Sequence, residues 1–117
     1  MNNQEAFDLM VNHIIAQGKP SINKMGDCMY RGQDNAMCAV GILIPDDKYT
    51  PAMENLNPYQ LVEHYGLDFG DVETGFLHEA QDRLHDTPAC EPHDNFVAEV
   101  KDNAQALARK WKLKCSI

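Results

Sequence analysis

The sequence predicts a mainly α fold: a compact bundle of four or five helices, classed α+β only if a small β-hairpin forms near residues 28–38. Three observations predict this class. Apolar residues recur at helical spacing in several segments, glycine and proline mark the ends of those segments, and 117 residues with 44% apolar residues suit one hydrophobic core. Because no repeat or linker-like tract divides the chain, we expect a single domain over residues 1–117.

The first helix is expected to begin at Asn2 or Asn3, either of which can cap it, and to end at Gly18. Its apolar residues lie three or four positions apart and therefore share one face: Phe7, Met10, Val11, Ile14 and Ile15. A continuous apolar face of this kind covers a hydrophobic core.

The hairpin prediction concerns residues 28–38, where two short segments flank a polar turn that contains glycine, asparagine and aspartate. A turn centred on Gln33 would place Cys28 directly opposite Cys38. The uninterrupted apolar run at residues 39–44 follows, and it fits a buried strand or a buried helical turn equally well. In either conformation this run belongs to the core.

Helix start and stop signals organise the second half of the chain. Proline at a first helical position, capping residues and glycine after an apolar stripe give the expected boundaries. The expected helices start after Thr50, Asn57 and Asp71 and near Pro92–Asp94, and the last three end near Gly66, His85 and Lys112.

The charge of the chain is negative and unevenly distributed. The formal net charge is −8, and residues 46–95 hold twelve acids but only two bases. Such a segment repels phosphates, so direct generic nucleic-acid binding is not expected. The five bases of residues 96–117 sit mainly at the end of an expected helix, where cations complement the helix dipole.

No apolar run approaches the roughly 20 residues that a membrane-spanning helix needs, and the first residues lack the features of a signal peptide. We therefore expect a cytoplasmic protein without membrane association. The sequence also lacks the phosphate-binding, dinucleotide-binding and nucleophile-elbow motifs, which favours a protein without catalysis.

The four cysteines are expected to be reduced thiols, and no cofactor is expected. An alternative is a zinc-stabilised structural module, since thiolates and imidazoles are the ligands of structural zinc. Nine residues separate Cys28 from Cys38, which is too long for a zinc knuckle, but the pair formed by Cys90 and His93 could supply a second half-site. The alternative zinc ligands are Cys28, Cys38, Cys90 and His93.

A second group pairs histidine with acids. His78 and Asp82 lie four residues apart on one helix, and His85 is adjacent to Asp86. A histidine with a carboxylate partner can act as a general base, although such pairs are also common on solvated helix faces. With Arg31 placed against a phosphate, this cluster suggests a second function, a small-molecule or nucleotide binder or hydrolase that uses His85.

The third group is a candidate recognition surface. Tyr30 and Arg31 adjoin each other near the turn, and an arginine beside an aromatic residue is common where a carboxylate, a phosphate or a partner protein is bound. The equally weighted alternative is a surface ion pair from Arg31 to a nearby aspartate. The acids Asp46, Asp47 and Glu54 could contribute to the same surface, or the two aspartates could simply form the turn after Pro45.

Two segments of the chain form a combined pattern: C-M-Y-R-G…C-A-V-G-I-L-I-P-D-D-K-Y…M-E within residues 27–54 and, less strongly, L-H-x-x-Q-x-x-L-H-D within residues 76–86. This pattern resembles that of a group of small proteins of bacteriophages and prophages. The group carries no established activity, so the resemblance implies only a setting: a phage accessory protein in the bacterial cytosol.

The sequence thus favours a phage-type accessory protein that binds and modulates a host protein factor without catalysis. The expected contact residues are Tyr30, Arg31, Asp46, Asp47 and Glu54, and the acidic middle would extend the surface.

Overall fold

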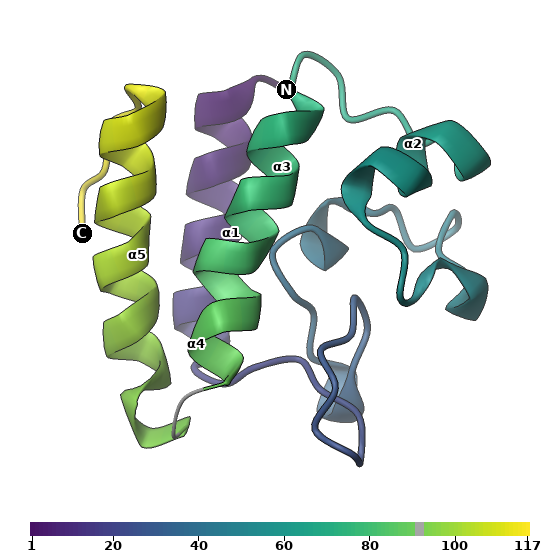
Figure 1. The fold of residues 1–117 in the computed structure, drawn as a ribbon, viewed down its shortest axis with the longest axis horizontal. Helices are drawn as coiled ribbons and strands as arrows, with labels where there is room; N and C mark the ends of the chain where they lie inside the picture. Colours follow the sequence, from purple (N-terminus) through teal and green to yellow (C-terminus); the bar gives the residue numbers. More distant parts are fainter. Residues whose placement is uncertain (91–92) are drawn as a thin grey trace.

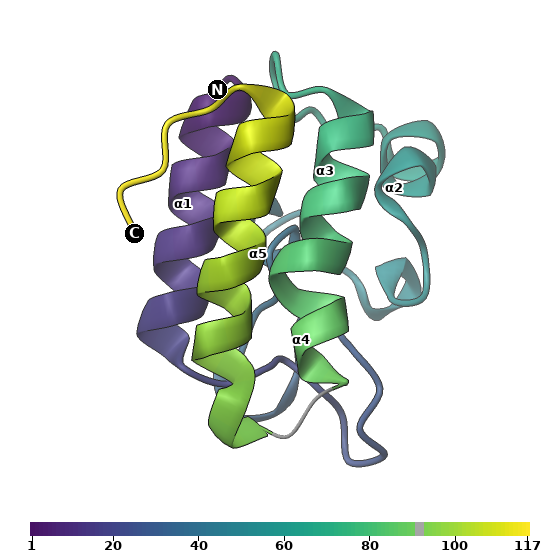
Figure 2. The same ribbon diagram turned by 60° about the vertical axis from the view of Figure 1, so that its left-hand side comes forward.

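The computed structural model describes residues 1–90 and 93–117, and the predicted mainly α fold is confirmed (Figure 1). Three long helical segments lie side by side in both views (Figures 1 and 2), and α2 and the irregular segment before it pack beside α3. The helices are α1 (Asn3–Gln17), α2 (Pro58–Tyr65), α3 (Thr74–Gln81), α4 (Thr87–Ala89) and α5 (Phe96–Trp111). In the described part of the chain, no helix is long and apolar enough to cross a membrane.

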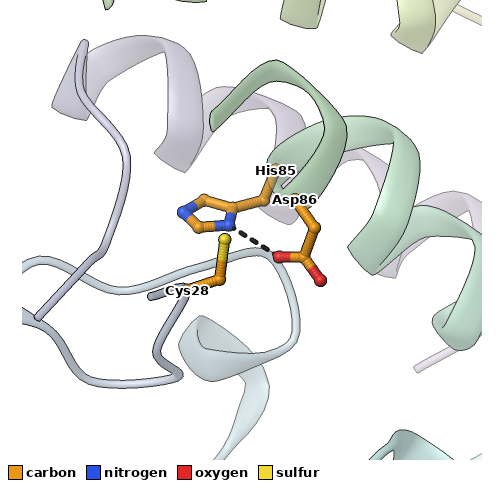
Figure 3. Close-up of side chains that lie close together, drawn as sticks. All are labelled: Cys28, His85 and Asp86. Carbon is orange, nitrogen blue, oxygen red and sulfur yellow. Dashed lines mark hydrogen bonds and ion pairs between the residues drawn. The ribbon is translucent and has the colours of Figure 1, made fainter. Parts of the chain in front are cut away.

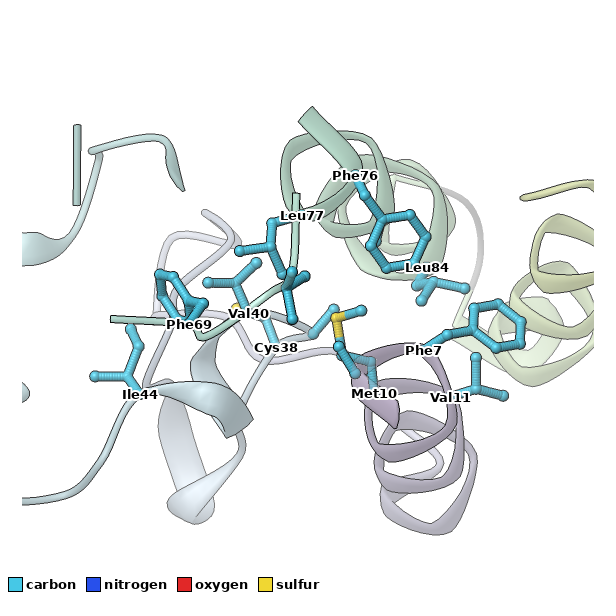
Figure 4. Close-up of a cluster of buried hydrophobic side chains, with 14 of the residues drawn as sticks. Phe7, Met10, Val11, Cys38, Val40, Ile44, Phe69, Phe76, Leu77 and Leu84 are labelled. Atoms are coloured by element: carbon cyan, nitrogen blue, oxygen red, sulfur yellow. The ribbon is translucent and has the colours of Figure 1, made fainter. Parts of the chain in front are cut away.

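Helix α1 forms where the sequence predicts it. Asn2 caps it in a reciprocal pair with Glu5, and Gly18 ends it in the left-handed conformation at φ 72°. The buried side chains of α1 are those of the predicted apolar face, with Ala6 added and Ile15 only partly buried. Phe7, Met10 and Val11 lie in the main core (Figure 4), while Ile14 packs with Phe96 and Val100 in a smaller cluster.

The helix expected to start after Asp71 begins instead at Thr74, and the residue before it, Glu73, is held by a residue far away in sequence. The side chain of Asn3 accepts a hydrogen bond from the amide of Glu73 at 2.9 Å and donates one to the Glu73 carboxylate at 3.0 Å. The cap position is occupied by Glu73 rather than Asp71, and the amide of Asp71 donates to the carbonyl of Met1 at 2.8 Å.

This helix also continues beyond the expected end at His85, through a π-helical turn (Asp82–Asp86) into α4. The wide turn has a local cause. Pro88 lacks an amide hydrogen and its ring cannot pack against a regular α-helical turn, so the preceding turn widens. In the π-helical pattern the amide of residue 88 would donate to the carbonyl of Arg83, but Pro88 has no amide hydrogen. The Arg83 carbonyl instead accepts a hydrogen bond from the Asn103 side chain of α5 at 2.9 Å.

The hairpin is reduced to isolated antiparallel bridges, and its predicted register is wrong. Arg31 bridges to Met37, and the amide of Cys38 donates to the carbonyl of Tyr30 at 3.4 Å, so Cys38 lies opposite Tyr30 rather than Cys28. Cys28 instead bridges to Ile22. The turn is centred one residue later than expected, because Asp34 and Asn35 both adopt positive φ.

Residues 39–44 belong to the core, as predicted, and they do so as a turn that includes a 3₁₀ segment (Gly41–Leu43). A Cβ atom at Gly41 would overlap the carbonyl oxygen of Tyr30, so only glycine permits this close approach of two chain segments. Val40 and Ile44 are buried, and in Figure 4 Val40 lies near Leu77 of α3 while Ile44 lies beside Phe69.

The remaining elements follow the sequence closely. The start signal after Thr50 gives a 3₁₀ turn (Pro51–Met53), and Asn57 caps α2, which Gly66 ends. The expected start of the last helix at Pro92 lies outside the described residues, and α5 itself ends before Lys112. The chain then turns back beside α1, where the side chain of Gln4 exchanges two hydrogen bonds with the backbone of Lys114, at 2.8 and 2.9 Å.

Candidate functional site

A cleft of about 560 Å³ opens between α3 with its π-helical turn on one side and the segments at residues 28–30 and 54–58 on the other. This volume falls in the usual range of ligand-binding clefts, about 300–1,000 Å³. The charged residues that line it are three acids of the helix, Glu79, Asp82 and Asp86, and Glu54 from the opposite wall. We call it the acidic cleft, since none of the described residues that line it is lysine or arginine.

One of the four acids that line the cleft, Glu79, is paired with basic side chains. Glu79 forms ion pairs with Lys110 at 2.9 Å and with Arg83 at 3.2 Å. Burial tends to raise the pKa of its carboxyl, but the hydrogen bonds from Lys110 and Trp111 outweigh burial, and the pKa is lowered. Asp82 is exposed, and its Oδ1 accepts from the Thr87 hydroxyl at 3.0 Å. Asp82, Asp86 and Glu54 are therefore the acids of the lining that form no described ion pair with a lysine or an arginine.

Glu54 holds the opposite wall together. Its carboxylate accepts from the amides of Tyr30 and Arg31 at 2.8 and 3.1 Å and from the hydroxyl of Tyr49 at 2.6 Å. The hydroxyl of Tyr30 donates to the carbonyl of Leu56. Burial and the hydrogen bond to Glu54 raise the pKa of Tyr49 to about 12. Glu54 thus fastens the turn at residues 30–31 to the segment that follows Tyr49.

Arg31 completes this arrangement on the side away from the cleft. Its guanidinium donates to the carbonyl of Ile44 at 2.7 Å, pairs with Asp46 at 2.9 Å and stacks 4.9 Å from the centre of the Tyr49 ring. Of the predicted contact residues, Tyr30, Arg31, Asp46 and Glu54 therefore converge, but they bind one another. Asp47 is exposed beside them.

Asp86, which lines the cleft, lies at the centre of a second network (Figure 3). Its Oδ1 accepts from Gln81 at 2.8 Å and lies 2.9 Å from Nδ1 of His85, a fully buried side chain. The other ring nitrogen, Nε2, accepts a hydrogen bond from the amide of Ser21 at 2.7 Å. Since an amide can only donate, Nε2 carries no hydrogen and the neutral ring holds its proton on Nδ1, facing Asp86.

Cys28, His85 and Asp86 place their ligand atoms within 4.8 Å of one another, and in residues 1–90 and 93–117 no other group of three such residues comes as close. The donor types suit zinc, but the hydrogen bonds do not. A metal on Nδ1 would replace the ring proton, while a metal-bound histidine normally donates from its other nitrogen, and here that nitrogen already accepts from Ser21. The group fits a hydrogen-bond network better than a metal site.

The four alternative zinc ligands are not brought together. Cys38 is fully buried in the core, where its sulfur accepts from the amide of Gly41 at 3.3 Å. His93 lies beside Lys19 at a separate small hollow. Only Cys90 comes near Cys28, and the Cys90 thiol donates to the backbone carbonyl of Asp86 at 3.3 Å.

The same geometry argues against nucleophilic catalysis. Burial, and next the negative charge of Asp86, raise the pKa of the Cys28 thiol to about 12, so almost none of it is thiolate near neutral pH. His85 has no nitrogen free to take its proton, because Ser21 and Asp86 engage both. What the cleft offers a ligand is shape, negative charge and hydrogen-bond acceptors.

The raised pKa gives a testable expectation for alkylation by iodoacetamide. A pKa of about 12 in place of the ordinary thiol value of 9.0 corresponds to a thiolate population lower by about a thousandfold. At pH 8 Cys28 is therefore expected to react far more slowly than the exposed Cys90, and its rate should still rise above pH 10. Mass spectrometry of tryptic peptides measures both rates, and unfolding in urea should make them similar. Equal rates in the folded protein would contradict the geometry described above.

Sequence reasoning missed Glu79 as a cleft residue, although a signal for it existed. Glu79, Asp82 and Asp86 are spaced by three and four residues, which places acids along one side of a helix. Ser21 could not be predicted from any local sequence pattern, because its contact with His85 spans 64 residues of sequence.

In comparisons with known proteins, no family model, curated protein or solved structure matches this chain.

Proposed function

We propose that this chain is a non-catalytic binding protein of the phage accessory type, which recognises a positively charged segment of a host protein in the acidic cleft. One observation carries the proposal: every charged residue of the lining, among those described, is an acid. The interactions described for Asp82 and Asp86 use Oδ1, so Oδ2 of each can accept from a lysine or an arginine of the partner.

The chemistry of the cleft supports binding over the alternatives. A nucleotide needs a cation opposite its phosphates, and Arg31, the residue suggested for that role, pairs with Asp46 instead. A general base needs a free ring nitrogen, and both nitrogens of His85 are engaged. The negative net charge also increases the rate at which a basic partner would find the cleft.

The proposal is tested by reversing one charge at the cleft. Asp82→Lys changes an exposed side chain that makes a single described hydrogen bond, and Asp102→Lys on the outside of α5 is the matched control. In affinity capture from bacterial lysate at low salt, wild-type protein and the control are expected to retain one identified host protein with a basic segment. Asp82→Lys should recover at least tenfold less of it.

Salt provides a second readout, because contacts between exposed charges are largely screened above about 0.5 M. The captured protein should elute as salt rises to that level. Capture that is equal for Asp82→Lys and wild type, or recovery of no protein even at low salt, would overturn the proposal.

A further inference from the structure

Helix α2 leaves an unusual share of its apolar surface uncovered. It buries Pro58 and Leu61. Three large apolar side chains remain open to solvent at three-residue intervals, and we call them the α2 stripe: Tyr59 (50% exposed), Val62 (37%) and Tyr65 (39%). Residues at this spacing share one side of a helix, so the stripe is a continuous surface rather than scattered side chains.

The α2 stripe begins where the acidic cleft ends. Pro58, the first residue of α2, lines the cleft, and so does His78, whose ring centre lies 5.6 Å from that of Tyr59. The hydroxyl of Tyr59 also lies close to Gly75, another residue of the cleft wall. Figure 1 shows α2 and α3 as neighbours at this place. Acidic and apolar surfaces are therefore adjacent, with Tyr59 at their border.

We propose that the α2 stripe and the acidic cleft form one docking surface for an amphipathic basic helix of the partner protein. This inference rests on the proposed function and adds the partner's shape and its apolar side. The apolar residues of the partner helix pack on Tyr59, Val62 and Tyr65, while a lysine or arginine from its flank reaches Asp82 and Asp86 in the cleft.

The dimensions and residue types agree with such a partner. From Tyr59 to Tyr65 the helix rises about 9 Å, which two turns of a partner helix would cover. Tyrosine is enriched at the centres of protein interfaces, because it buries a large area and loses little side-chain entropy. A docked helix would remove all three side chains from water, which the fold itself does not do.

The negative charge around the α2 stripe disfavours two other ligands that an apolar helix face could bind, an anionic membrane and an acidic peptide. An anionic membrane surface would be repelled by the acids of the cleft and by Glu63, which is exposed on α2 within the same turns. An acidic peptide would meet the same repulsion. An amphipathic basic segment can bind the apolar stripe and the acidic cleft at once, whereas a purely charged or a purely apolar segment can bind only one of them.

Three fluorescein-labelled peptides of about 15 residues test the inference by fluorescence anisotropy. The first is an amphipathic helix of leucine and lysine, the second has the same composition in scrambled order, and the third is the leucine–glutamate version of the first. Wild-type protein is expected to bind the first at least tenfold more tightly than the second and to show no binding of the third.

Variants locate the apolar contact. Val62→Ser is expected to weaken binding of the amphipathic basic peptide about tenfold, whereas Leu9→Ser, at a similarly exposed position on α1, should leave it unchanged. Circular dichroism of each variant should match that of the wild type, since neither side chain is buried. Asp82→Lys should weaken both basic peptides, and Asp102→Lys neither.

The outcomes separate this inference from the function on which it rests. If both basic peptides bind equally and Val62→Ser has no effect while Asp82→Lys does, the docking helix is overturned and the cleft keeps its proposed role. If neither basic peptide binds, or if Asp82→Lys changes nothing, the cleft proposal is overturned together with the inference.

Discussion

Replacing Glu54 with alanine is expected to lower the free energy of unfolding by about 3–5 kcal/mol, because three donors then lose one charged acceptor. The amides of Tyr30 and Arg31 and the hydroxyl of Tyr49 all donate to its carboxylate. These donors are partly buried, and the remaining wall offers them no substitute among the described contacts. Each hydrogen bond to a charged group contributes roughly 1.5–3 kcal/mol, reduced here by partial exposure to water.

Urea unfolding followed by circular dichroism measures the change. Glu54→Gln retains one carbonyl oxygen as an acceptor for the Tyr30 amide but places its NH2 group, a donor, opposite the Arg31 amide, so an intermediate loss of about 1–2 kcal/mol is expected. Glu63→Ala removes an exposed carboxylate from α2 and should change the free energy by less than about 0.5 kcal/mol. If Glu54→Ala were as stable as Glu63→Ala, Glu54 would not hold the cleft wall together.

Replacing His85 with alanine should be as severe, at about 3–5 kcal/mol, since it combines a cavity with lost hydrogen bonds. The ring is fully buried, and it packs edge to face against Phe96 with 6.1 Å between ring centres. Its removal leaves the buried amide of Ser21 without an acceptor and takes one donor from Asp86. The same urea titration measures this loss.

His85→Gln is the conservative comparison, because its side-chain oxygen can accept from Ser21 and restore part of the stability. A separate spectroscopic test addresses the proton itself. Long-range ¹H–¹⁵N NMR spectra of the wild type should place the hydrogen on Nδ1 and show Nε2 as the unprotonated nitrogen. A proton on Nε2 would be incompatible with the hydrogen bond from Ser21.

The parts of the fold that short-range chemistry determines were predicted well. The apolar face of α1 and the capping signals at Asn2 and Asn57 depend on residues within one or two helical turns, so their outcome can be inferred from sequence alone. The start of α3 could not, because Glu73, the residue just before it, is held by hydrogen bonds to Asn3 across 70 residues. Its extension through the π-helical turn depends on Pro88 and on support from α5.

Of the contact residues expected from the sequence, Tyr30 and Glu54 line the acidic cleft, whereas Arg31, Asp46 and Asp47 do not. Tyr30, Arg31 and Glu54 do lie together. Which atoms bond within this group depends on the register of residues 30–38, and positive φ at Asp34 and Asn35 shifts that register from the expected one. Arg31 forms an ion pair with Asp46 and stacks on Tyr49, because both residues lie close to it in the fold. No local pattern encodes that distance.

The contact between Gln4 and the backbone of Lys114 has a practical consequence for how binding is measured. It fixes the final residues beside α1, and Gln105 holds the carbonyl of Ile117 at 2.7 Å. The C-terminus consequently emerges beyond α5, on the opposite side of the helices from α2 (Figures 1 and 2). A biotin or sensor-chip linker attached there would orient every immobilised molecule with its acidic cleft and α2 stripe toward the flowing solution.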